Sequence, residues 1–70
     1  MSETLEILVD ALVTDEELRA SFMRNPRQTL RFADDWGLPI CVSEMFALMT
    51  SGRPVWDRVA EAVNARLQAA

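Results

Sequence analysis

Histidine, tyrosine and lysine are absent from this chain of 70 residues, and the only cysteine is Cys41. The commonest general base, the amine that forms Schiff bases and most of the usual zinc ligands are therefore missing. A single cysteine also excludes an internal disulfide framework. The carboxylate clusters at 15–17 and 34–35 lack the spacing of a calcium loop, and neighbouring carboxylates on a helix point apart. We therefore expect a protein that is not an enzyme, with no catalytic residue, cofactor or metal.

Long apolar runs are also missing, and none approaches the length of a membrane span. The amino-terminal residues MSETLE are acidic, where a secretory signal is basic and then apolar. These features predict a cytoplasmic protein that does not contact a membrane. The length predicts one domain, residues 1–70, near the lower limit for a self-sufficient core. A second copy or a larger protein is therefore expected to add stability.

The apolar residues recur at helical spacing, and no alternating strand pattern is present. We predict an all-α fold of five short helices in an irregular orthogonal bundle. The first helix has Ser2 as its cap and ends near Val13. The other predicted helices cover about Asp15 to Arg24, Pro26 to about Trp36, the segment before Gly52, and the segment from Pro54 onward. The residues expected at the centre of the core are Leu18, Phe22, Leu30 and Leu48.

Capping residues mark the predicted helix boundaries. Thr14 and Glu17 have capping-box spacing, and Asn25, followed by proline and then by Gln28, repeats this device. Gly37 is expected to end the third helix in the left-handed conformation, with Leu38 folding back onto its last turn.

The fourth helix has two possible caps, Ser43 and Cys41. At the cap position the backbone dipole lowers the pKa of a thiol and favours the reactive thiolate. Cys41 lies between Ile40 and Val42, however, and no base is near in sequence. We therefore expect that Cys41 is a half-buried, unreactive thiol, or that it occupies the cap position without contributing to the stability of the helix.

The charges separate along the chain, although the net charge is −4. Residues 1–17 contain acids and no base, whereas residues 19–31 contain arginines and no acid. Such a charge dipole can steer association with a complementary surface, or it can consist of helix-start carboxylates and solvated arginines. The negative total argues against nucleic acid as the main partner.

Large flexible and aromatic side chains exceed what so small a core can bury, and such surfaces are typical of protein-binding grooves. We predict a protein partner and a homodimer, or a monomer that dimerises until it meets its partner. The predicted partner-binding residues are Arg24, Arg27, Arg31, Phe46, Met49 and Trp56.

Residues 5–50 resemble a recurrent helical module in which L-R-x-x-F is followed by N-P, a leucine and G-L. The matching residues are Asp15, Leu18, Arg19, Phe22, Asn25, Pro26, Leu30, Gly37, Leu38 and Glu44. The module is similar to leader regions of precursors of ribosomally synthesised, modified peptides (RiPPs), namely the nitrile-hydratase-like, nitrogen-fixation-type and borosin leaders. It is also similar to the LigA-like small subunit of extradiol dioxygenases. The resemblance implies a non-catalytic docking protein or leader-like precursor that binds a modifying enzyme or a large subunit.

Two features of the carboxyl-terminal half bear on this function. Residues 55–70 have the pattern of an amphipathic helix rather than that of a loose core peptide, which favours a stand-alone leader-like protein. The region from Ala33 to Leu67 also resembles a helix-turn-helix transcriptional regulator. Its candidate recognition helix, SEMFALMTS, has no base for contacts with DNA. The alternative functions to the docking protein are a small helix-turn-helix transcriptional regulator and an accessory small subunit of an extradiol dioxygenase.

Overall fold

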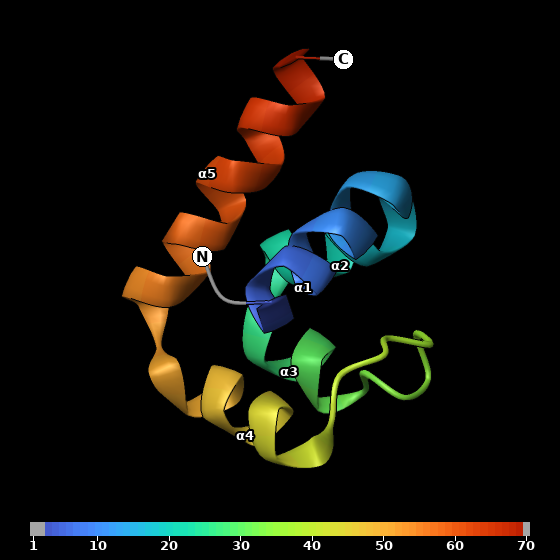
Figure 1. The fold of residues 1–70 in the computed structure, drawn as a ribbon, viewed down its shortest axis with the longest axis vertical. Coiled ribbons are helices and arrows are strands. Elements are labelled where there is room, and N and C mark those ends of the chain that lie inside the picture. Colours follow the sequence, from blue (N-terminus) through green and yellow to red (C-terminus); the bar gives the residue numbers. More distant parts are fainter. Residues whose placement is uncertain (1–2, 70) are drawn as a thin grey trace.

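The computed structural model describes residues 3–69, which form five helices and contain no strand (Figure 1). The helices are α1 (Glu3–Thr14), α2 (Glu16–Arg24), α3 (Pro26–Arg31), α4 (Val42–Ser51) and α5 (Arg53–Ala69). The predicted all-α class is confirmed. The Ser2 cap lies outside the described residues.

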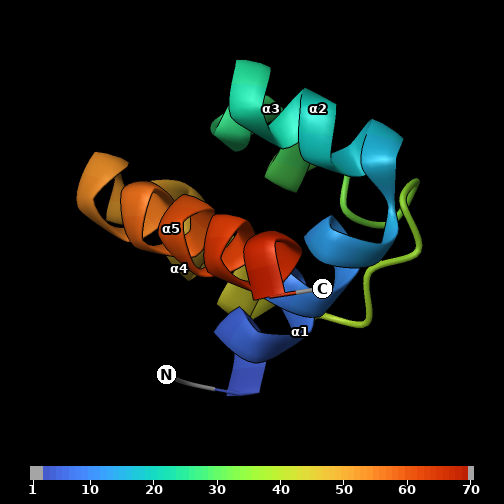
Figure 2. The same cartoon turned by 90° about the horizontal axis from the view of Figure 1, so that it is seen from above.

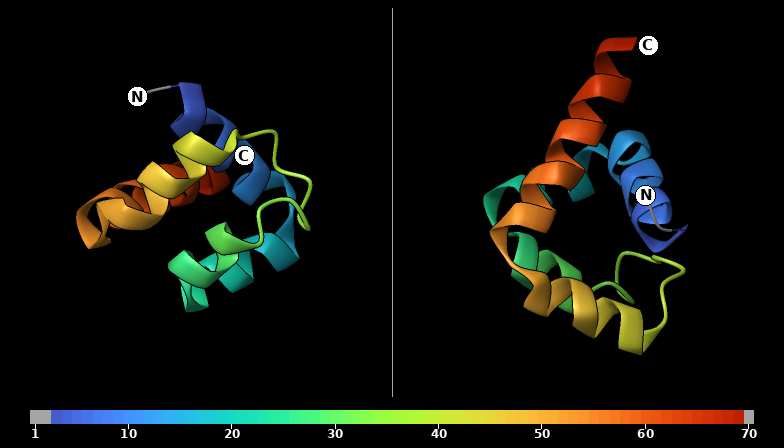
Figure 3. Two further views of the ribbon diagram at one scale, coloured as in Figure 1. Left: turned by 90° about the horizontal axis from the view of Figure 1, so that it is seen from below. Right: turned by 60° about the vertical axis from the view of Figure 1, so that its left-hand side comes forward.

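The helices form a ring in which each helix packs against the next one along the chain, and α5 returns to α1. The ring is visible in the right panel of Figure 3, and Figure 2 shows α2 and α3 on the opposite side of the molecule from α1. Helix α5 packs against the ring as far as Val63, which is buried, whereas residues 64–69 at its carboxyl-terminal end are all exposed (Figure 1). This arrangement is compatible with the predicted orthogonal bundle.

The core lies inside the ring and draws side chains from every helix. Leu18, Phe22 and Leu30 are almost completely buried, and Leu48 is 7% exposed, as predicted. The other buried apolar residues are Leu8, Val9, Leu12, Ala33, Leu38, Ile40, Met45, Val59 and Val63. Leu67, in the exposed last part of α5, is 38% exposed.

The boundary between α1 and α2 lies one residue later than predicted. Thr14 is the last residue of α1, and its hydroxyl donates a hydrogen bond to the carbonyl of Asp10 at 2.8 Å. The N-cap of α2 is Asp15, whose Oδ1 accepts a hydrogen bond from the Leu18 N–H at 3.1 Å. The predicted Thr14–Glu17 capping box is therefore wrong. Asp is preferred over Thr at the N-cap, and a cap at Asp15 leaves Thr14 free to extend α1.

The start of α3 follows the prediction. Asn25 is the N-cap, Pro26 occupies the first turn, and Asn25 Oδ1 accepts a hydrogen bond from the Gln28 N–H at 3.2 Å. The Gln28 side chain accepts from the Asn25 side-chain amide at 3.3 Å rather than from the Asn25 backbone N–H. That N–H is already bonded to the Ser21 carbonyl at the end of α2.

The third helix is shorter than predicted, because α3 ends at Arg31 and tight turns replace its last part. These turns end as predicted at Gly37, which has a φ of 71°. The Gly37 N–H bonds to the Asp34 carbonyl and the Leu38 N–H to the Ala33 carbonyl, both at 3.1 Å, which is the Schellman arrangement. Leu38 is buried as a result.

Both ends of α4 are marked by residues that the sequence singled out. Cys41 occupies the N-cap position, and Gly52, with a φ of 86°, follows the last residue of the helix. Pro54 then lies in the first turn of α5, where a missing N–H costs no intrahelical hydrogen bond. None of the helices in the described part of the chain is both long and apolar enough to cross a membrane.

Candidate docking surface

An open groove of about 230 Å³ lies between α3 and α4, and we call it the α3–α4 groove. Its floor consists of buried apolar residues, including Leu30, Ile40 and Met45. Its lining is completed by Arg31, Ala33, Asp34, Val42, Phe46 and Met49. The groove is therefore mainly apolar, with one positive and one negative residue among those that line it.

Two large apolar side chains beside this groove face solvent. Val42 is 82% exposed and Phe46 is 66% exposed, although neither residue is in a loop. They are four residues apart in α4 and therefore lie on the same side of the helix, and Met49 continues this row one turn later. Exposed apolar residues scattered singly are normal on protein surfaces, whereas a row beside an apolar groove is typical of a binding site.

The structure brings five of the six predicted partner-binding residues to one side of the molecule. Arg31, Phe46 and Met49 line the α3–α4 groove. Arg31 and Met49 also line an adjoining hollow together with Arg27. The Arg27 guanidinium lies over the ring of Trp56, at 5.5 Å from its centroid. The predicted set is therefore spatially connected across α3, α4 and the start of α5.

Arg24 lies farther along the same face. It lines a third hollow, together with Asn25, Gln28 and Phe32, and these three residues also line the hollow that holds Arg27. The three hollows are therefore continuous around α3, with Arg24 farthest from the apolar row on α4.

Two of the residues predicted as exposed anchors are in fact half-buried. Met49 and Trp56 both pack against the core. The Trp56 Nε1 donates a hydrogen bond to the Leu48 carbonyl at 3.2 Å, near the end of α4. This bond and the contact with Arg27 hold the indole in place between α3, α4 and α5. Trp56 therefore fixes the helices that border the groove, and Phe46 is the exposed anchor.

The arginines of the predicted basic segment differ in their surroundings. The Arg19 guanidinium donates hydrogen bonds to the carbonyl oxygens at the end of α1, and its role is therefore structural. Arg24, Arg27 and Arg31 are exposed, and within residues 3–69 none of the three forms an ion pair. Their charges are therefore available to an incoming molecule.

Cys41 is exposed rather than half-buried, which corrects the expectation of a partly buried thiol. It makes no side-chain capping bond, and its Sγ lies 3.3 Å from the Ser43 hydroxyl. The Ser43 hydroxyl and the Glu44 N–H lower the pKa of the Cys41 thiol, because both stabilise the thiolate. The thiol is therefore accessible and more acidic than an ordinary cysteine.

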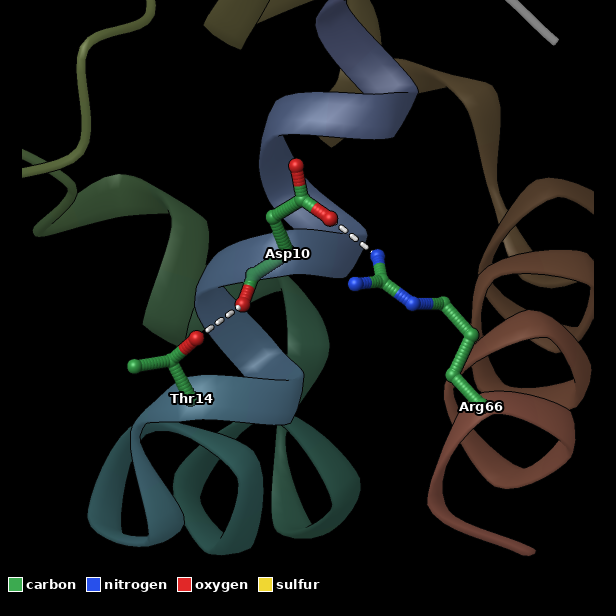
Figure 4. Close-up of polar contacts among 3 residues, drawn as sticks. All are labelled: Asp10, Thr14 and Arg66. Atoms are coloured by element: carbon green, nitrogen blue, oxygen red, sulfur yellow. Dashed lines mark hydrogen bonds and ion pairs between the residues drawn. The ribbon is translucent and has the colours of Figure 1, made fainter. Parts of the chain in front are cut away.

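A separate hollow lies between α1 and α5 and is lined by Val9, Ala62 and Ala65 together with charged residues. Asp10 and Arg66 form an ion pair across it (Figure 4). Both side chains are more than half exposed. This pair connects the two ends of the helix ring, on a different side from the predicted partner-binding residues.

Sequence reasoning missed the most exposed apolar residue, Val42. Its neighbours Ile40 and Cys41 lie in an apolar run that suggested a buried segment. The spacing of four residues between Val42 and Phe46 could have indicated its exposure, since residues four apart lie on the same face of a helix. Phe32 and Met23 are also exposed, at 47% and 45%, and neither was among the predicted partner-binding residues.

Comparison with known proteins gives no further assignment: no family model, curated protein or solved structure matches the chain. Within residues 3–69, no group of three metal-binding side chains is positioned to hold an ion. The resemblance to leader regions and dioxygenase small subunits remains a prediction, as does the homodimer.

Proposed function

We propose that this chain is a non-catalytic docking protein that binds a larger protein through the α3–α4 groove. The observation that carries the proposal is the row formed by Val42 and Phe46, which are 82% and 66% exposed beside an apolar groove. Covering this row removes apolar surface from water, and such burial contributes about 25 cal/mol per Å².

The surrounding charges support the same function. Arg27 and Arg31 lie beside the apolar row and, among residues 3–69, have no ion-pair partner. An apolar centre with charged residues around it is the usual composition of a protein interface. The apolar part contributes most of the affinity, and the charges contribute to orientation and association rate.

The class of partner follows from the module that residues 5–50 resemble. In leader regions and in dioxygenase small subunits, the module acts on a larger biosynthetic or oxidative enzyme by binding to it. We therefore propose that the partner is such an enzyme and that this chain supplies recognition rather than reacting groups.

The test is to co-express the chain with the enzymes encoded by its neighbouring genes and to measure the affinity of any complex by calorimetry. Phe46→Asp places a charge in the apolar row and is expected to abolish binding. The matched control is Ala47→Asp, at an exposed position of α4 that does not line the groove. The control is expected to bind like the unmodified chain.

Equal affinities for the unmodified chain and Phe46→Asp would overturn the assignment of the groove. A regulator would instead bind DNA, and its affinity would fall steeply with salt concentration in gel-shift assays. Such a result, together with no binding to any neighbouring enzyme, would overturn the docking function as a whole.

A further inference from the structure

The α3–α4 groove has two electrically different ends. Loop 32–41 reverses the direction of the chain, so α3 and α4 run in opposite directions (Figures 1 and 3). Arg27 and Arg31 consequently lie at the Met49 end, where all three line one hollow. Asp34 follows α3 and lines the groove with Ile40 and Val42. The Met49 end is therefore positive and the Val42 end is negative.

The apolar row between these ends has the spacing of a helix face. Val42, Phe46 and Met49 are separated by four and three residues, so their side chains project from successive turns of α4. A second helix laid along this row can place its own apolar residues between them, as in helix-in-groove recognition. A bound helix suits a mainly apolar groove, because its backbone polar groups are already paired within it.

From these features we infer that the α3–α4 groove binds an amphipathic helix of the partner in one orientation. The acidic end of that helix lies against Arg27 and Arg31, and its apolar stripe covers Val42 and Phe46. Its other end carries basic or neutral residues beside Asp34, because an acidic residue there would be repelled. The inference rests on the proposed docking function and specifies the chemistry and direction of the bound segment.

A second copy of this chain fits the groove less well. The most acidic helix of the chain is α1, which carries Glu3, Glu6 and Asp10. Its apolar residues Leu8 and Val9 are only 1% and 2% exposed. Since α1 has the charges but its Leu8 and Val9 are not free, the acidic helix of a second copy does not match the groove, and we assign the occupant to another protein.

Cys41 permits a direct test of the orientation. It is the only cysteine, it is exposed, and it lies between two groove residues, Ile40 and Val42, at the negative end. A bimane fluorophore attached to Cys41 is quenched when a tryptophan approaches it closely. The ligands are two synthetic helical peptides with the same apolar stripe, with glutamates at one end and lysines at the other. One peptide carries tryptophan at its basic end and the other carries it at its acidic end.

Both peptides are expected to bind with the same affinity, measured by calorimetry. Only the peptide with tryptophan at its basic end is expected to quench the bimane beyond the protein's own background. Arg27→Glu/Arg31→Glu should weaken binding by about tenfold or more at low salt, since opposite charges become like charges. The control Arg53→Glu/Arg58→Glu makes the same charge change at two exposed positions of α5 that do not line the groove, and should bind as the unmodified chain does.

Three results would overturn the inference. Equal quenching by both peptides would mean that the groove does not select direction. Bimane fluorescence that changes with protein concentration alone would place a second copy in the groove. Absence of peptide binding, with the partner enzyme still sensitive to Phe46→Asp, would reject the acidic helix and leave the docking function intact. If Phe46→Asp left the binding of the partner enzyme unchanged, by contrast, the groove would not be the docking site, and the failure would lie in the proposed function rather than in the chemistry of the bound helix.

Discussion

The guanidinium of Arg19 in α2 donates a hydrogen bond to the carbonyl oxygen of Leu12 in α1, at 3.1 Å. The same nitrogen lies 3.2 Å from the Val13 carbonyl oxygen. The last carbonyls of a helix lack intrahelical partners and carry partial negative charge. The last turn of α1 contains no basic residue of its own, so Arg19 satisfies these carbonyls from the next helix.

Arg19→Ala is expected to destabilise the fold by about 1–2 kcal/mol, within the range for hydrogen bonds to charged groups at a half-buried site. Chemical denaturation followed by circular dichroism measures this change. Arg24→Ala is the matched control, because the Arg24 side chain is exposed and makes no hydrogen bond or ion pair among residues 3–69. Equal midpoints for the two variants would show that Arg19 does not cap α1.

The Asp10–Arg66 ion pair should contribute little, although it joins the first and last helices (Figure 4). Exposed pairs typically contribute about 0.2–1 kcal/mol, because water and salt screen the charges. A double-mutant cycle with Asp10→Ala and Arg66→Ala should give a coupling energy in that range at low salt. The coupling should disappear at about 1 M salt, where the screening length is about 3 Å. A coupling that survives high salt would contradict this assignment.

The start of α2 provides a test of the corrected cap. Asp15→Ala removes the acceptor for the Leu18 N–H and is expected to cost about 0.5–2 kcal/mol. Thr14→Ala should cost less, since the Thr14 hydroxyl bonds to a carbonyl within α1. Asn25→Ala should resemble Asp15→Ala, because it removes the acceptor for the Gln28 N–H. A larger loss for Thr14→Ala than for Asp15→Ala, measured by denaturation, would restore the original cap.

The number and order of the helices could be predicted from the sequence because most of their starts and stops are coded locally, although α3 ends at Arg31 rather than near Trp36. Asn25 and Pro26 begin α3, and Gly37 and Gly52 supply left-handed turns. The local sequence could not decide whether Thr14 or Asp15 is the N-cap of α2. Both residues are good caps, and the decision depends on how far α1 extends before α2 packs against it.

The site was less predictable, because it depends on which faces the ring of helices leaves uncovered. Phe46 and Met49 have similar hydrophobicity, yet one is 66% exposed and the other packs against the core. Their difference arises from the position of α3 beside α4, a contact between segments separated by loop 32–41. The role of Arg19 depends likewise on the path of α2 past the end of α1.

Leu30 should be among the most sensitive positions, since it is 0% exposed at the centre of the ring. Leu30→Ala is expected to cost about 2–5 kcal/mol, the usual range for deleting a buried leucine side chain. Such a loss is a large part of the stability of a small domain. Leu67→Ala is the control, because Leu67 is 38% exposed near the end of α5. Similar thermal midpoints for the two variants would show that Leu30 is not central to the core.

The Ser43 hydroxyl and the Glu44 N–H lower the pKa of the Cys41 thiol. A lowered pKa increases the thiolate fraction below the pKa of an ordinary thiol, so alkylation by iodoacetamide should reach half its maximal rate at a lower pH than that of free cysteine. Ser43→Ala removes the larger stabilising contact and should move this midpoint upward. Glu44→Gln should move it downward, because the Glu44 carboxylate raises the pKa of the thiol. Coincident pH profiles for the three proteins would show that neither the Ser43 hydroxyl nor the Glu44 carboxylate acts on the Cys41 thiol.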